Sequence, residues 1–171
     1  MPRYVAFLRG VSPVNAKMPE LTRCFEGAGF RNVRTILSSG NVAFDARSAS
    51  EALIKRKAES SMQEILGRTF FTIVRQSDSL LALLETDPFA AYAVSTSAKR
   101  VITFLHEPIT TRVALPLESD GARVLSLVGR EAFTAYMPSE KGPVFMKLIE
   151  KAFGTDVTTR TWETVRKCAA A

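Results

Sequence analysis

The chain has 171 residues, of which 46% are hydrophobic and 23% are charged, as in soluble globular proteins. This length suits one ordinary domain or two small ones. No apolar run approaches the ~20 residues that span a bilayer, and the opening apolar run is too short for a signal peptide, so we expect a cytoplasmic protein with no membrane partner. The net charge of +6 favours anionic partners without singling out nucleic acid.

The first half of the chain alternates between strand and helix patterns. Short β-prone runs at 4–8, 33–37, 42–44 and 69–75 predict four strands. Apolar residues at helical spacing, bounded by Pro19 and Gly29, predict a helix between the first two strands. Ser48-Ala49-Ser50-Glu51 matches a capping box and opens a second helix that ends at Gly67, with its basic triplet 55–57 pointing mostly outward. The resulting βαββαβ order is the split pattern of a ferredoxin-like sandwich.

The second half repeats part of this order. A Leu-rich helix at 77–84 precedes a small, polar stretch at 93–97, where we place the domain boundary. The following patterns predict a strand at 101–105, a helix over 110–117, a hairpin of 124–128 with 132–137, and helices at 144–153 and 161–169. The sequence therefore predicts an α+β protein. Its ferredoxin-like unit covers 1–94, and a second, related βαββα unit with a closing C-terminal helix covers 95–171.

Catalytic and cofactor motifs are missing from the sequence. It contains no GxxxxGK[ST] or GxGxxG loop, no HExxH and no CxxC pair. His106 is the only histidine, which excludes a multi-histidine zinc site, and the carboxylate pairs fall at loop or cap positions. We expect Cys24 and Cys168 to be reduced thiols, and the default interpretation of Cys24 is a side chain that packs in the core. We expect no metal and no cofactor.

Polar residues and glycines gather at two predicted strand ends. The first strand leads into a loop, and the second and third strands are joined by a turn. In a split βαβ order the first and third strands are neighbours, so we expect the loop and the turn to be close. Exposed backbone N–H groups, amides and an arginine suit a carboxylate or phosphate. The candidate binding residues here are Arg9, Gly10, Asn15, Lys17, Ser39, Gly40 and Asn41.

Two further observations bear on this candidate site. Thr159 and Arg160 precede the last predicted helix, whose N-terminus attracts anions, so we add them as a third wall. The hydroxyls around them are also read as helix caps, and Trp162 as a core residue. Gly40 and Asn41 are equally well explained as ordinary residues of a hairpin turn.

Three segments together resemble an uncharacterised bacterial family, the domain of unknown function (DUF) 1697 proteins. The resemblance covers nearly the whole chain and implies a two-part α+β architecture with ferredoxin-like topology, but no activity. The matching residues are Tyr4-Val5-Ala6-Phe7-Leu8-Arg9-Gly10 with Met18, Leu21 and Gly29-Phe30; Val33-Arg34-Thr35 with Ser39-Gly40-Asn41-Val42; and Thr158-Thr159-Arg160 with Trp162, Thr164 and Val165.

The chain departs from this family pattern in three places. The family's glycine pair in the first loop is absent, and Pro13 stiffens that loop. The glycine-rich stretch before the penultimate helix reads Ser139-Glu140-Lys141-Gly142-Pro143-Val144, and the family's asparagine after Thr158-Thr159-Arg160 is Thr161. The resemblance therefore implies an altered site.

Three functions remain open. The first is a binding protein for an anionic small molecule or nucleotide-like ligand. The second is a hydrolase that uses Ser39 or Cys24, against which stands the lack of a convincing general base. The third is an RNA-binding module, by analogy of fold alone, with Phe7 and Phe44 as stacking candidates. The sequence leaves the oligomeric state open.

Overall fold

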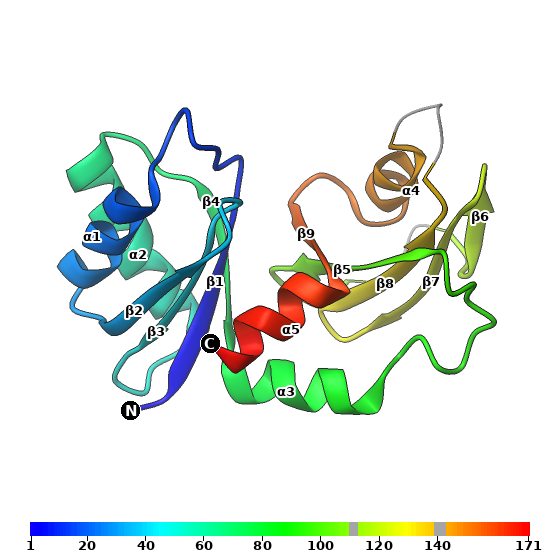
Figure 1. The fold of residues 1–171 in the computed structure, drawn as a ribbon, viewed down its shortest axis with the longest axis horizontal. Helices are drawn as coiled ribbons and strands as arrows, with labels where there is room; N and C mark the ends of the chain where they lie inside the picture. The colour runs from blue at the N-terminus through cyan, green and yellow to red at the C-terminus, as the bar shows by residue number, and fades with distance from the viewer. Residues whose placement is uncertain (110–112, 139–142) are drawn as a thin grey trace. The chain divides into compact units, whose positions relative to one another are not determined.

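The computed structural model describes residues 1–109, 113–138 and 143–171, which form five helices and two antiparallel sheets (Figure 1). The fold is mixed α+β, as predicted. The chain divides into a first unit, Met1–Glu85 with Arg166–Ala171, and a second unit, Thr86–Val165. The boundary expected between residues 94 and 95 falls inside the second unit. None of the helices in the described residues is long and apolar enough to cross a membrane.

The first unit contains a four-stranded sheet in the order β2-β3-β1-β4. β1 therefore lies between β3 and β4 and is antiparallel to both, an arrangement compatible with a ferredoxin-like fold. The elements follow the predicted βαββαβ order: β1 (Arg3–Arg9), α1 (Met18–Gly27), β2 (Arg31–Ile36), β3 (Asn41–Asp45), α2 (Glu51–Leu66), β4 (Phe71–Gln76) and then α3 (Ser77–Thr86).

The core of this unit lies between the sheet and the helices α1 and α2, which cover one face of it (Figure 1). Alternate residues of β1 face this core, because successive strand side chains point to opposite sides. Phe44 of β3 packs against Phe25 of α1 and against Phe30, with ring centroids 5.2 and 4.4 Å apart. Each such buried side chain contributes about 1.5–3 kcal/mol.

The start of α2 differs in detail from the capping-box prediction. Ser50, and not Ser48, is the N-cap: its hydroxyl accepts a hydrogen bond from the Leu53 amide at 3.1 Å. The Glu51 carboxylate accepts from the Gln76 amide at 3.2 Å instead of closing a capping box. Ser48 and Ala49 are thereby left outside the helix, in the connection from β3.

The second unit contains a five-stranded sheet in the order β6-β7-β8-β5-β9, followed in the chain by α5 (Trp162–Ala170). Its elements are β5 (Lys99–Leu105), β6 (Leu117–Ser119), β7 (Ala122–Val128), β8 (Glu131–Tyr136), α4 (Val144–Phe153) and β9 (Val157–Thr161). The element order thus differs from the expected βαββα. Of the helix expected over 110–117, residues 110–112 lie outside the described part; the described remainder is not helical and leads into β6. Residues 139–142 of the altered family stretch also lie outside it.

The strand β9 is the main element that the sequence did not predict. Its threonines were read as caps for the last helix, but all five residues, Val157–Thr161, pair with β5 as an edge strand. β-branched threonine suits such a strand. The capping itself is confirmed, since the Thr161 hydroxyl accepts from the Thr164 amide at 3.2 Å. Trp162 is buried and its ring meets Phe89 edge-on at 5.2 Å, as a core role predicts.

Candidate functional site

The first loop and the turn between β2 and β3 lie side by side, as the split strand order predicts. Phe7 is paired with Asn41 across β1 and β3, and the Leu8 amide donates to the Gly40 carbonyl at 2.8 Å. Gly40 has a φ of +86°, and a Cβ built on it would lie 2.9 Å from Cγ2 of Val11. A side chain at position 40 would therefore push the loop away from the turn.

The amide side chains of this region hold its backbone. The Asn15 Nδ2 donates to the Gly10 carbonyl at 2.7 Å, and its Oδ1 accepts from the Ser12 amide at 2.8 Å. Asn41 is fully buried, and its Nδ2 donates to the Ile36 carbonyl and the Ser39 hydroxyl, both at 3.0 Å. The two asparagines thus stabilise the loop and the turn with the groups that were predicted to hold a ligand.

The cations at this end of the sheet are exposed. Arg9 ends β1 and places its guanidinium 4.9 Å from the centre of the Phe71 ring, which is directly opposite on β4. Lys17 precedes α1 and makes no capping hydrogen bond with its side chain. Both residues are exposed, and the backbone between them turns at Gly10, which has a φ of +88°.

Thr159 and Arg160 belong to the second unit, whereas the loop and the turn belong to the first. The Thr159 hydroxyl is hydrogen-bonded to that of Thr103 at 2.9 Å, and the Arg160 Nη1 donates to the Thr159 carbonyl at 2.9 Å. Both residues are in β9 and not in a loop ahead of a helix. β9 runs directly into α5, so Arg160 still lies one residue ahead of Thr161, whose hydroxyl caps that helix.

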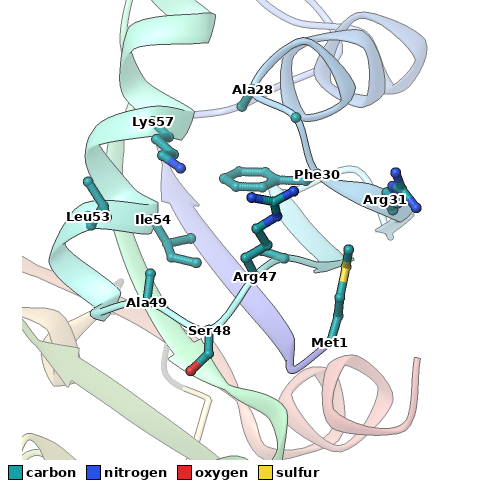
Figure 2. A pocket seen from close by; sticks show the side chains of 12 residues that line it. Met1, Ala28, Phe30, Arg31, Arg47, Ser48, Ala49, Leu53, Ile54 and Lys57 are labelled. Carbon is teal, nitrogen blue, oxygen red and sulfur yellow. The ribbon is translucent and has the colours of Figure 1, made fainter.

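A pocket that the sequence did not predict lies at the opposite end of the first unit's sheet (Figure 2). It has a volume of about 420 Å³ and lies where β2 begins and β3 ends, next to the segment that leads into α2. Ser48 and Ala49, which the N-cap at Ser50 leaves outside the helix, form part of its wall. The lining residues are Met1, Ala28, Gly29, Phe30, Arg31, Ala46, Arg47, Ser48, Ala49, Leu53, Ile54 and Lys57.

The charged side chains of this pocket are all cationic. Arg31, Arg47 and Lys57 are exposed, and none of them forms an ion pair or side-chain hydrogen bond within the described residues. No carboxylate is among the described residues that line the pocket. Like charges gathered without a counter-charge produce a local positive potential.

The carboxylate nearest to this wall in sequence is engaged elsewhere. Asp45 accepts from Asn32 Nδ2 at 2.7 Å and from Arg3 Nη1 at 2.8 Å. The hydrogen bond from Asn32, followed by that from Arg3, lowers the pKa of Asp45 below its ordinary value. Asp45 therefore stays ionised at neutral pH, with its charge directed at Arg3 and Asn32.

The floor of the pocket is apolar. Ile54 and Phe30 are buried, and Phe30 stacks on Phe44 beneath. Figure 2 shows the Phe30 ring between the guanidinium of Arg47 and the ammonium of Lys57. Gly29, with a φ of +91°, turns the chain from α1 into β2 and so sets Phe30 at this place. An apolar floor with polar groups at the edge is the usual composition of a small-molecule site.

The pocket offers binding groups but no acid–base pair. Ser48 is its one hydroxyl among the described lining residues, which include no histidine. No cluster of His, Cys, Asp or Glu suited to a metal ion occurs in the described part of the chain. Burial raises the pKa of the Cys24 thiol, with Glu20 adding to this and Arg23 opposing it, so Cys24 is a poor nucleophile.

The RNA-stacking hypothesis for Phe7 and Phe44 is wrong, because both rings are fully buried and no base can reach them. The hydrolase hypothesis gains no support, since the Ser39 hydroxyl accepts a hydrogen bond from the Asn41 amide, a group that cannot act as a general base.

Comparison with known proteins places the chain in a family without assigning a function. No curated protein matches it. Among solved structures it is similar to the conserved bacterial protein SP0830 from Streptococcus pneumoniae, with a TM-score of 0.71 and 19% identity over 99% of this chain and 97% of that one. At this identity the likeness concerns the fold alone. A family model described as "Protein of unknown function (DUF1697)" matches residues 1–133, and the chain therefore belongs to the DUF1697 family.

Proposed function

We propose that the first unit binds a small organic anion in the pocket rimmed by Arg31, Arg47 and Lys57. One observation carries the proposal: three cations line a pocket of ligand size that has no carboxylate in its lining, and none of the three forms an ion pair among the described residues. Pockets for small molecules generally have volumes of ~300–1,000 Å³, and the 420 Å³ found here falls in that range.

The residue types favour a phosphate or carboxylate group on the ligand. An arginine guanidinium presents parallel N–H donors that match two oxygens of such a group, and a lysine ammonium adds a compact charge. An anion between them would also relieve the repulsion among the three cations. The apolar floor formed by Phe30 and Ile54 would cover an organic portion of the ligand.

The loop and turn at the other end of the sheet remain a weaker candidate for the same function. Arg9, Lys17 and Ser39 are exposed there and suit an anion. The amides of Asn15 and Asn41, however, are used within the loop and the turn. Arg160, together with Thr159, stays a separate proposal in the second unit.

Binding of inorganic phosphate, sugar phosphates and small carboxylates, measured by calorimetry and thermal shift, tests the pocket. Arg47→Ala and Arg31→Ala are each expected to weaken the best anion at least about tenfold, equivalent to ~1.4 kcal/mol. Arg34→Ala is the matched control for Arg31, because Arg34 is on the same strand, is exposed and does not line the pocket.

Each variant removes one positive charge, so a general effect of net charge would weaken all three proteins equally. That result would overturn the proposal, as would the absence of any anion that stabilises the wild type. An effect confined to Arg9→Ala would move the site to the first loop.

A further inference from the structure

A second hollow continues the basic pocket along α2. It has a volume of about 460 Å³ and shares Ala28, Leu53 and Lys57 with the pocket, so the two are adjacent. Its lining residues are Gly27, Ala28, Leu53, Arg56, Lys57, Ser60, Ser61 and Glu64. We refer to the pocket and this hollow together as the α2 groove.

The groove exists because α1 ends close against α2. The Ser61 hydroxyl donates to the Cys24 carbonyl, and a Cβ added to Gly27 would lie 3.1 Å from both Ser61 Oγ and Ile65 Cδ1. The small residues at this crossing, Gly27 and Ser61, allow the end of α1 to pack closely against α2. On the exposed side, residues at spacings of three and four, such as Leu53, Lys57 and Ser60, follow one another along α2.

Positive charge extends along most of the groove. Arg31 and Arg47 are in the pocket, Lys57 is at the junction, and Arg56 is in the second hollow. Arg56 is exposed and, like Lys57, forms no ion pair or side-chain hydrogen bond within the described residues. Glu64 is the one carboxylate among the described residues of the groove.

The neighbouring lysine behaves differently. Lys55 pairs with Glu59 at 3.6 Å and lines neither hollow. Because consecutive helix residues are about 100° apart around the axis, Lys55 points away from the face that carries Lys57. The basic triplet therefore contains two residues of the groove and one that is neutralised outside it.

We infer that the ligand carries at least two phosphate groups in a row, one held by Arg31 and Arg47 and the next by Lys57 and Arg56. This inference rests on the proposed function and names its ligand class. Successive phosphates match successive cations along the two adjacent hollows, and the guanidinium of Arg56 provides the same paired donors as those of Arg31 and Arg47. A ligand with a single anionic group leaves Arg56 unused.

Calorimetric titration with inorganic phosphate, pyrophosphate and tripolyphosphate at one fixed ionic strength tests the inference. The wild type is expected to bind tripolyphosphate at least about tenfold more tightly than phosphate, a difference of ~1.4 kcal/mol. Arg56→Ala is expected to lose most of this gain while its affinity for phosphate stays the same. Lys55→Ala, which removes the same charge from the same helix, is expected to keep the gain.

The outcomes separate the two proposals. If phosphate binds and Arg47→Ala weakens it, but chain length or Arg56→Ala has no effect, the polyphosphate inference fails and the proposed function stands. If Arg56→Ala and Lys55→Ala lose the gain equally, the polyanion is attracted by the basic surface in general, which also overturns the inference. If no anion responds to Arg47→Ala, the proposed function fails. Arg56 is exposed on a helix, where alanine is favourable, so these variants are expected to fold.

Discussion

Replacing Gly40 with alanine probes how closely the first loop packs against the turn between β2 and β3. Two effects act on the alanine. The φ of +86° is unfavourable for any residue with a Cβ, and that Cβ would lie 2.9 Å from Cγ2 of Val11 and 3.1 Å from Cβ of Leu8. Real Cβ atoms essentially never come within 3.0 Å of such an atom, so the contact with Val11 forces the loop or the turn to shift.

The two effects are separated by Gly10→Ala. Gly10 has nearly the same φ, +88°, but a Cβ there meets no atom within 4 Å. Gly10→Ala is expected to lower the free energy of unfolding by ~1–2 kcal/mol through the backbone alone. Overpacking adds ~1–3 kcal/mol at Gly40, so Gly40→Ala is expected to lose about 2–5 kcal/mol.

Urea unfolding followed by far-UV circular dichroism measures these losses, because the single tryptophan, Trp162, is in the second unit. Hydrogen exchange of the Leu8 amide, which donates to the Gly40 carbonyl, reports on the same contact locally. In a double-mutant cycle, Val11→Ala is expected to restore part of the loss in Gly40→Ala. Equal losses in Gly40→Ala and Gly10→Ala, with no coupling to Val11, would refute the tight contact.

Two further predictions concern buried and charged groups of the first unit. Asn41→Ala leaves the buried Ile36 carbonyl without this donor and is expected to lower the free energy of unfolding by ~1–3 kcal/mol. Ser39→Ala is expected to lower it by ~1 kcal/mol or less. A larger loss for Ser39→Ala than for Asn41→Ala in urea unfolding would contradict the role given to Asn41. The pKa of Asp45 is lowered in the folded state, so its stabilisation is complete above the unfolded pKa of ~3.9 and is lost as pH falls through the folded value. The difference in the free energy of unfolding between the wild type and Asp45→Asn is therefore expected to be largest near neutral pH and to shrink below pH ~4. A difference that does not depend on pH would contradict the hydrogen-bonded carboxylate.

Much of the fold was predictable from local sequence patterns. The apolar periodicity of 144–153 coincides with α4 (Val144–Phe153), and the predicted neighbours β1 and β3 do pair. β9 was not predicted, because its threonines carry no strong alternation and its strand character depends on β5, more than 50 residues earlier. A short stretch of sequence does not show which distant strand it will pair with.

The candidate site was less predictable than the fold. Glycines and asparagines at strand ends suggested a ligand, but the same chemistry also serves the chain's own backbone, as Asn15 and Asn41 do here. The basic pocket has no sequence motif, since Arg31, Arg47 and Lys57 come from separate segments. One distinction within this set was available from the sequence. Lys55 lies four residues before Glu59 on the predicted helix, a spacing that favours an ion pair, whereas Lys57 lies on a different face of the helix.

The division of the chain has a consequence for the order of folding. The second unit, Thr86–Val165, is one continuous stretch, whereas the first also needs Arg166–Ala171. The Arg3 Nε donates to the Ala171 carbonyl at 2.7 Å across 168 residues of sequence. On the ribosome, Met1–Glu85 emerges before Thr86–Val165, and this contact can form only once Arg166–Ala171 has been made. The first unit can therefore be completed only after the whole of the second unit has been synthesised.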